Sequence, residues 1–315
     1  MLFSINPTSY QNAIDLIRLG IERITIGDPL FSCRNSCNLS IDEIKKVLSN
    51  KNNTKVIILV NKIFFENELV NLEKYLIEIC QLDIDGIEFA DYAVLQILHE
   101  NNLSKKIYTI YNPETLVVSY QQFPFYLQND INEVFVAREL NQHQINEIGK
   151  NKGLMNIGIQ VCGYSYMMQS RWDLLSNFNK SHPDIKLHLA NQKLFLQEEH
   201  RNSPYIIYED KDGTHNFTGY NLNLISCINE VFNNKVDVCR IETFLHDENW
   251  TIQVAKIFIK ISDDLKNKNL TQNKLDGYIS QFNTFDNEYQ SCGFYRSSPE
   301  DLIYLEQYQK GPNND

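Results

Sequence analysis

The feature that most constrains this fold is a regular alternation between short apolar runs and amphipathic segments. The runs are rich in Ile and Val, as strands buried on both faces of a parallel sheet are. They cover residues 2–7, 23–28, 54–64, 84–91, 105–112, 131–139, 155–163 and 235–242. Helical patterns lie between them at residues 8–20, 40–50, 68–82, 92–102, 140–150 and 251–265, with Thr8 as the expected N-cap of the first. Eight strands alternating with helices predict a (β/α)8 TIM-barrel-like domain.

Two segments depart from this alternation and divide the chain. Residues 178–220 are polar and weakly periodic, which predicts a small insertion before the last strand within a barrel domain of residues 1–265. Short β segments are expected inside it at 186–190, 192–197, 205–210 and 214–219, with a hairpin turn at Asp212-Gly213. Residues 266–315 are rich in Asn, Asp, Gln and Ser, and we expect this polar tail to pack loosely.

Charge and composition narrow the functional classes. The net charge of −11 argues against a protein that binds nucleic acid over its whole surface, although a local basic patch stays open. The sequence holds no apolar run long enough to span a bilayer and does not begin with a signal-peptide pattern, so we expect a cytoplasmic protein that does not contact membranes. Seven cysteines without a disulfide-framework spacing are expected to be reduced thiols.

Standard catalytic motifs are weak or absent in the sequence. It contains no phosphate loop, no dinucleotide-binding glycine pattern, no His-Glu-x-x-His and no Gly-x-Ser-x-Gly. Cys162 at a strand end could be a nucleophile, but no histidine is placed beside it by the sequence, so a buried structural thiol is favoured. The Cys33–Cys37 pair lacks the second ligand pair of a zinc site, so no metal is predicted.

Polar side chains at the carboxyl ends of the strands are the candidate site, because chemistry in a (β/α)8 barrel belongs there. Two arginines, Arg138 and Arg240, stand next to carboxylates in the sequence. Arginine holds planar anions such as carboxylates through two hydrogen bonds, which indicates a small acidic ligand. The alternative is that Arg138-Glu139 and Arg240-Glu242 only pair across the mouth, and the sequence leaves both interpretations open.

Several motifs along the chain resemble the collagenase-like peptidase family U32, and within it the short Firmicute-type subgroup. The matching stretches are VNKIFFENEL from Val60, IEFADYAVL from Ile87, NPET from Asn112, VARELN from Val136, IQVCG, MMQSRWDLLSNF, YEDKDGTH from Tyr208 and RIET from Arg240. The resemblance implies a barrel-like domain. It further implies the first of two paired proteins that 5-hydroxylate the wobble uridine, uridine-34, of tRNA, with prephenate as co-substrate.

The sequence also departs from the family pattern. Members that carry an iron–sulfur cluster have cysteines where this chain has Tyr166, Asp173 and Asn223. The resemblance therefore implies no cofactor in this chain, with a cluster expected only in a paralogous U32 partner. Two further differences lie at the NSCN loop after Arg34 and at Arg240 and Thr243, which replace a lysine and a glycine.

Three hypotheses follow. The first is a component of tRNA hydroxylation that binds a small dicarboxylate such as prephenate through Arg138, Arg171 and Arg240, and meets tRNA within a hetero-complex. The second is a peptidase, for which no catalytic motif is recognisable, and the third is a non-catalytic partner of a cluster-bearing paralogue. The expected ligand-binding residues are Asn61, Asp91, Asn112, Glu114, Arg138, Glu139, Gln160, Arg171, Arg240 and Glu242. No catalytic residue is assigned.

Overall fold

Eight parallel strands close into a barrel in the computed structural model, which describes residues 1–185, 194–197, 199 and 204–297. Neighbouring strands pair in sequence order, and the last one pairs in parallel with both the seventh and the first, so the sheet has no open edge there. The strands are β1 (Leu2–Ile5), β2 (Arg23–Gly27), β3 (Lys55–Val60), β4 (Gly86–Phe89), β5 (Thr109–Tyr111), β6 (Glu133–Phe135), β7 (Asn156–Ser170) and β11 (Val238–Ile241). The predicted (β/α)8 barrel is confirmed.

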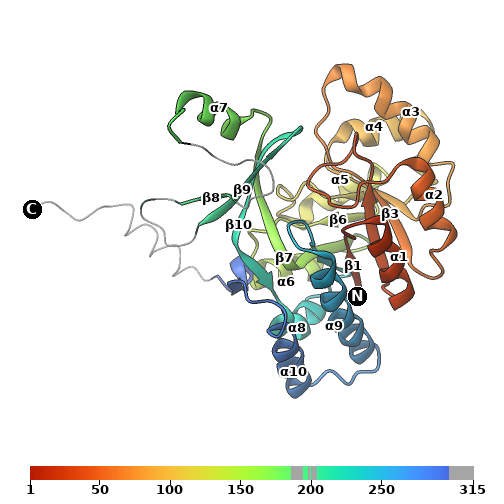
Figure 1. Ribbon diagram of the computed structural model, residues 1–315. Coiled ribbons are helices and arrows are strands. Elements are labelled where there is room, and N and C mark those ends of the chain that lie inside the picture. The colour runs from red at the N-terminus through yellow and green to blue at the C-terminus, as the bar shows by residue number, and fades with distance from the viewer. Residues whose placement is uncertain (186–193, 198, 200–203, 298–315) are drawn as a thin grey trace, which may run out of the picture.

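Helices connect successive strands and lie around the barrel (Figure 1). They are α1 (Tyr10–Leu19), α2 (Ile41–Ser49), α3 (Leu69–Ile79), α4 (Tyr92–Glu100), α5 (Phe123–Gln128), α6 (Gln142–Asn151), α8 (Ile228–Asn233) and α9 (Glu248–Lys266). The two not predicted, α5 and α8, have six residues each, too few to show a helical period. Over the described ranges, no helix combines the length and apolar composition that a membrane crossing requires.

The first helix begins one residue later than the sequence predicts. Ser9 is its N-cap, because the Ser9 hydroxyl accepts a hydrogen bond of 3.0 Å from the backbone N–H of Asn12. The prediction of Thr8 as the cap is wrong. Thr8 instead donates its backbone N–H to the Asn12 side chain, at 3.0 Å.

Side chains of the barrel strands alternate between the outer core and the interior. The outward apolar set packs under the helices, while Ile57, Ile110, Phe135 and Val238 form a separate apolar cluster. These four positions share the strand parity of the buried ions Arg23 and Glu133, which places both sets inside the barrel.

An arm of antiparallel strands grows out of the barrel at β7 (Figure 1). Beyond Cys162, β7 leaves β11 and pairs with β10 (Gly213–Asn223), which continues through β9 (Tyr205–Asp210) to β8 (Leu194–Leu196). The β segments expected at 192–197, 205–210 and 214–219 match these strands, whereas the one at 186–190 lies outside the described residues. The helix α7 (Leu174–Ser181) also belongs to this region.

The predicted hairpin between β9 and β10 is present, but its two-residue turn is Lys211-Asp212, one position before the Asp-Gly pair, because Gly213 already pairs with Asp210. Gly213 adopts a φ of 111°, and a Cβ atom there would lie 2.1 Å from the Ser170 carbonyl oxygen. A glycine is therefore needed for both conformation and space.

The polar segment after Lys266 is more ordered than its composition predicts. It forms α10 (Gln272–Phe282), β12 (Gln290–Ser291) and a 3-10 turn, η4 (Gly293–Arg296). Leu275 and Phe282, seven residues apart and therefore on one face of α10, are fully buried. The expectation of loose packing is wrong for residues 272–296, because a few apolar anchors suffice to dock a polar helix. Residues 298–315 lie outside the described ranges.

We expect Arg23→Met to destabilise the protein strongly. The Arg23 guanidinium makes two hydrogen bonds, of 2.8 and 2.9 Å, to the Glu133 carboxylate, and both side chains are only 2% exposed. Removing one partner leaves a buried charge, at a cost of about 3–5 kcal/mol of unfolding free energy in urea titrations. The double variant Arg23→Met/Glu133→Leu should recover most of that loss, and a double variant no more stable than the single one would contradict this explanation.

Candidate functional site at the barrel mouth

A buried arginine organises the centre of the barrel mouth. Arg240, on β11, is 1% exposed; it forms an ion pair with Glu88 of β4 and donates 2.9 Å to Asn6 Oδ1. Asn112, after β5, donates to the other oxygen of Glu88 at 2.8 Å. The carboxyl ends of four strands are thereby connected by charge-assisted hydrogen bonds, as their shared direction allows.

A second cluster joins three loops above this layer. Glu114 accepts from Arg34 at 3.0 Å through one oxygen and from Arg138 at 3.2 Å through the other. Arg138 also donates to the Tyr166 carbonyl oxygen at 2.7 Å, and the Arg34 guanidinium lies 4.1 Å from the centroid of the Tyr166 ring. The Glu114 carboxylate is thus shared by two guanidinium groups, and the trio carries one surplus positive charge.

Both loops that supply the Arg34–Glu114 pair are conformationally strained. Arg34 has a φ of 51° and Glu114 a φ of 65°, in the left-handed region that side chains other than glycine rarely adopt. Their side chains are only 6% and 13% exposed. Such strain persists where surrounding contacts hold the residue in place, and it clusters at functional sites.

Glu242 lies between the two clusters and interacts electrostatically with residues of both. Its carboxylate is 3.8 Å from Arg240 Nη1, and its side chain is 15% exposed. Burial raises the pKa of Glu242 above its usual 4.5, although Arg240 and Arg138 each act in the opposite direction. A carboxyl group of this kind takes up a proton more readily than an exposed glutamate.

Gly163 brings β11 against β7 next to Glu242. It has a φ of 99°, and a Cβ atom there would lie 1.9 Å from the Glu242 carbonyl oxygen. Any side chain at this position would push the two strands apart at the mouth.

Three other predicted residues hold loops in place. Asn61 exchanges hydrogen bonds with the backbone of Cys33, at 2.9 and 3.1 Å. Asp91 caps α4 and also accepts the backbone N–H of Phe64. Gln160 donates to the backbone carbonyl groups of residues 162–164 and accepts from Ser165, so it shapes the bend where β7 leaves the barrel.

Glu139 and Arg171 lie apart from the two arginine clusters. Arg171 donates to the Ile63 carbonyl oxygen at 2.6 Å and stacks on the Phe65 ring at 4.0 Å, on the loop after β3. Glu139 is exposed and does not pair with Arg138, which is bound to Glu114 instead. Arg138-Glu139 is therefore not an ion pair, whereas Arg240 and Glu242 are close enough to interact. That the ten residues bind a ligand stays a prediction.

Arg34 was not among the residues that the sequence pattern predicts. The pattern points to residues directly at strand ends, whereas Arg34 lies seven positions beyond the end of β2, in the long connection to α2. The available signal was its place in a loop on the carboxyl side of the barrel, where sites are built.

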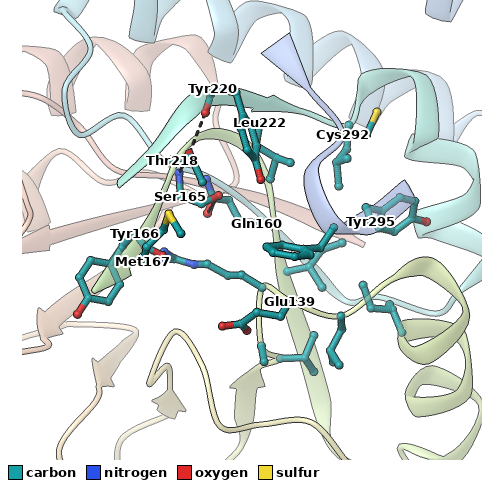
Figure 2. A pocket seen from close by; sticks show the side chains of 18 residues that line it. Glu139, Gln160, Ser165, Tyr166, Met167, Thr218, Tyr220, Leu222, Cys292 and Tyr295 are labelled. Carbon is teal, nitrogen blue, oxygen red and sulfur yellow. Dashed lines mark hydrogen bonds between the residues drawn. The ribbon is translucent and has the colours of Figure 1, made fainter. Parts of the chain in front are cut away.

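An apolar pocket lies beside the mouth, between β7, β10, the loop before α6 and the η4 turn (Figure 2). It encloses roughly 770 Å³ of space that includes open solvent. Glu139, Gln160, Ser165 and Thr218 are polar groups of its lining, while Val136, Leu140, Ile145, Ile159, Leu222 and Leu224 form apolar walls.

Three residues lie where the sequence resemblance implies cysteines in cluster-bearing members, and none of them can supply a thiolate. Tyr166 stacks on Arg34, Asn223 donates to Gln290 at 2.8 Å, and Asp173 precedes α7. In the described part of the chain, no group of three His, Cys, Asp or Glu side chains is placed to hold a metal ion. Burial raises the pKa of the Cys162 thiol well above its ordinary value, which fits a structural cysteine.

A curated protein aligns with this chain over most of the length of both. It is "tRNA hydroxylation protein P2" from Bacillus subtilis (strain 168), which is 27% identical over 264 residues, covering 82% of this chain and 84% of that protein. The sequence resemblance implied the first member of such a pair, whereas this relative is designated P2.

Solved structures and a family model complete the comparison. The U32 peptidase Mk0906 aligns over 76% of this chain and 91% of its own, with 10% identity and a TM-score of 0.47. A 2,3-dimethylmalate lyase aligns over 98% and 94%, with 7% identity and a TM-score of 0.43. The model of peptidase family U32 matches residues 8–303, and this protein therefore belongs to that family.

Proposed function

We propose that this protein is a component of prephenate-dependent 5-hydroxylation of tRNA uridine-34, and that it binds a small dicarboxylate at the barrel mouth. The general role is supported by the relative named for tRNA hydroxylation, with which this chain aligns over most of its length. The ligand class is supported by the arginine chemistry of the mouth.

The surplus positive charge of the Arg34–Glu114–Arg138 trio is the observation that carries the ligand proposal. One carboxylate balances two guanidinium groups, so an incoming anion meets a net positive charge in a largely buried setting when Glu242 is protonated. Guanidinium groups bind carboxylates in a planar, two-pronged geometry. A ligand carboxylate would share Arg138 with Glu114, and the nearby charge of Arg34 would favour it.

The trio expected from sequence, Arg138, Arg171 and Arg240, is revised in this proposal. Arg240 is enclosed by Glu88 and Asn6, so we assign it the role of positioning the mouth. Arg171 is occupied by the loop after β3. Direct contact with the ligand is assigned to Arg138, whereas Arg34, which is 6% exposed and donates to both Glu114 and Gln169, is assigned a positioning role.

We also propose that the protein works in a hetero-complex with a cluster-bearing U32 paralogue and meets tRNA through that complex. Tyr166, Asp173 and Asn223 at the family's thiolate positions support a division of labour in which the redox chemistry belongs to the partner. Co-purification of the paralogue with this chain would test the complex, with strains that lack either protein as controls. Recovery of this chain without the paralogue would contradict the complex.

A peptidase role is less well supported, although the family bears that description. The Ser181 hydroxyl lies 3.0 Å from His182 Nδ1, but both residues are exposed and adjacent in the chain. Among the described residues, no carboxylate forms a hydrogen bond or ion pair with that histidine. The arrangement lacks the third group that fixes a catalytic base.

We expect Arg138→Ala to abolish function in cells. A strain lacking this protein should lose the nucleosides derived from 5-hydroxyuridine, the wild-type gene should restore them, and Arg138→Ala should restore less than about a tenth, because losing charge-assisted hydrogen bonds costs about 1.5–3 kcal/mol. Mass spectrometry of tRNA nucleosides provides the measurement. Arg18→Ala, at an exposed arginine on α1, is the matched control.

Two outcomes of this experiment would separate the hypotheses. Unchanged modification in the deletion strain would exclude a role in tRNA hydroxylation. Full restoration by Arg138→Ala, together with loss in the deletion strain, would exclude the anion site and favour the non-catalytic partner.

We expect binding of prephenate to weaken as pH rises through the raised pKa of Glu242. Below that pKa the folded protein carries Glu242 protonated, so an anion meets less repulsion, and above it the carboxylate is charged. By the same linkage, Glu242 protonation stabilises the folded state at low pH, and this contribution is lost as pH rises above 4.5. Calorimetric titrations at pH values upward from 4.5, roughly one pH unit apart, should show the trend.

The matched variant for this test is Glu242→Gln. It keeps the shape of the side chain and removes the titrating group, so the pH dependence of the dissociation constant should flatten. An equally steep dependence in Glu242→Gln would assign the effect to another group.

A further inference from the structure

Two cysteines distant in sequence lie side by side behind the pocket. The sulfur atoms of Cys227 and Cys292 are 3.9 Å apart, although 65 positions separate them in the chain. Cys227 ends the η3 turn (Ile225–Cys227) before α8, and Cys292 follows β12. Parallel pairing of β12 with β10 holds the C-terminal segment in this position.

The pair joins an inner thiol to one that reaches the pocket. Cys227 has no exposed surface, whereas Cys292 is half-buried and lines the pocket, on the same side as Tyr295 (Figure 2). Cys292 is therefore the more accessible residue of the pair, and Cys227 lies buried next to it.

Charge around Cys227 favours a thiolate. Donation from the Cys292 thiol is the main reason that the pKa of Cys227 is lowered, and Ser226 and the Arg296 guanidinium act in the same direction. Arg296 is held by Glu230 at 2.6 Å and by Gln142 at 2.8 Å. The same contact raises the pKa of the Cys292 thiol, so the thiolate of the pair lies on Cys227 and the remaining proton lies on Cys292.

The remaining cysteines behave in the opposite way. Burial raises the pKa of Cys33 and Cys80 to about 11 and that of Cys37 to about 12. Burial also raises the pKa of Cys162 and Cys239. Reactivity of a thiol follows its thiolate fraction and its access, so the Cys227–Cys292 pair is distinguished among the seven cysteines.

We propose that Cys227 and Cys292 are a reversible redox pair, which a hydroperoxide entering the pocket converts to a disulfide. This role does not depend on tRNA hydroxylation. It assigns a modification site to the far side of a pocket whose lining also includes Arg138.

The chemistry balances in two steps. Transfer of the Cys292 proton to Cys227 first leaves a thiolate on Cys292. This thiolate attacks the hydroperoxide; an S–O bond forms, the O–O bond breaks, and the departing oxyanion takes a proton from water. The Cys227 sulfur then attacks the Cys292 sulfenic acid; the S–S bond forms and water leaves with the thiol proton. Two electrons pass from the two sulfurs to the peroxide, and an added dithiol reverses the result.

Disulfide formation would also reshape the pocket. The two sulfurs must approach from 3.9 Å to about 2.05 Å, which moves the segment carrying Cys292 toward η3. Phe294 and Tyr295 follow Cys292 closely and line the same pocket. Oxidation would therefore shift one wall of the pocket.

The test is oxidation of the purified full-length protein with hydrogen peroxide. We expect the free thiols to fall from seven to five, because the disulfide consumes two, and we expect dithiothreitol to restore them. Non-reducing peptide mapping should recover one cross-linked pair containing residues 227 and 292. This mapping uses the wild-type chain, so it does not depend on any variant folding.

Two cysteine variants test whether the oxidation occurs at this pair. Cys292→Ser should lose the cross-link and its pair of thiols, whereas Cys80→Ser, at another half-buried cysteine, should oxidise like the wild type. Slower oxidation of the pair than of Cys80, cross-links at other cysteines, or an unchanged loss of thiols in Cys292→Ser would each overturn the proposal.

Discussion

Charged side chains placed inside or at the end of a barrel must find partners of opposite charge, and this requirement shapes the whole site. Arg23 is matched by Glu133 within the barrel, and Arg240 by Glu88 nearer the mouth. Burial without such partners would cost several kcal/mol per ion. The same rule produces an uneven result above them, where Glu114 serves two arginines. This imbalance, above a layer of neutralised charges, is the feature on which the proposed anion site rests.

The barrel could be predicted from sequence because its strands are buried on both faces, so each appears as a continuous apolar run. The arm could be predicted as well, since its turn carries Asp212-Gly213. Only part of the arginine cluster could be predicted from sequence, namely Arg138 and Glu114. Arg34 lies in a long loop and has a positive φ, and neither the path of a loop nor its strain produces a periodic sequence pattern. The packing of the segment after Lys266 could not be predicted from its polar composition. That composition reflects the exposed face, whereas Leu275 and Phe282 are buried.

Membership of family U32 fixes ancestry and architecture but not chemistry, since function is carried by the site and not by the fold. Here the family's cysteine positions are occupied by Tyr166, Asp173 and Asn223. Tyr166 has acquired a different role, because its ring supports Arg34 and its carbonyl group holds Arg138. A position at which the sequence resemblance implies a cysteine in other members is thus part of the Arg34–Glu114–Arg138 cluster in this chain.

The path of β7 has a mechanical consequence. One continuous strand runs from the barrel wall at Asn156 to the arm at Ser170, changing partners from β11 to β10 near Cys162. Gly163, with a φ of 99°, lies where the partner changes, so the strand bends there. Tyr166 lies on the arm side of this bend, and its carbonyl group accepts from Arg138 at 2.7 Å. The arm and the Arg138 guanidinium are thereby linked through a single piece of backbone.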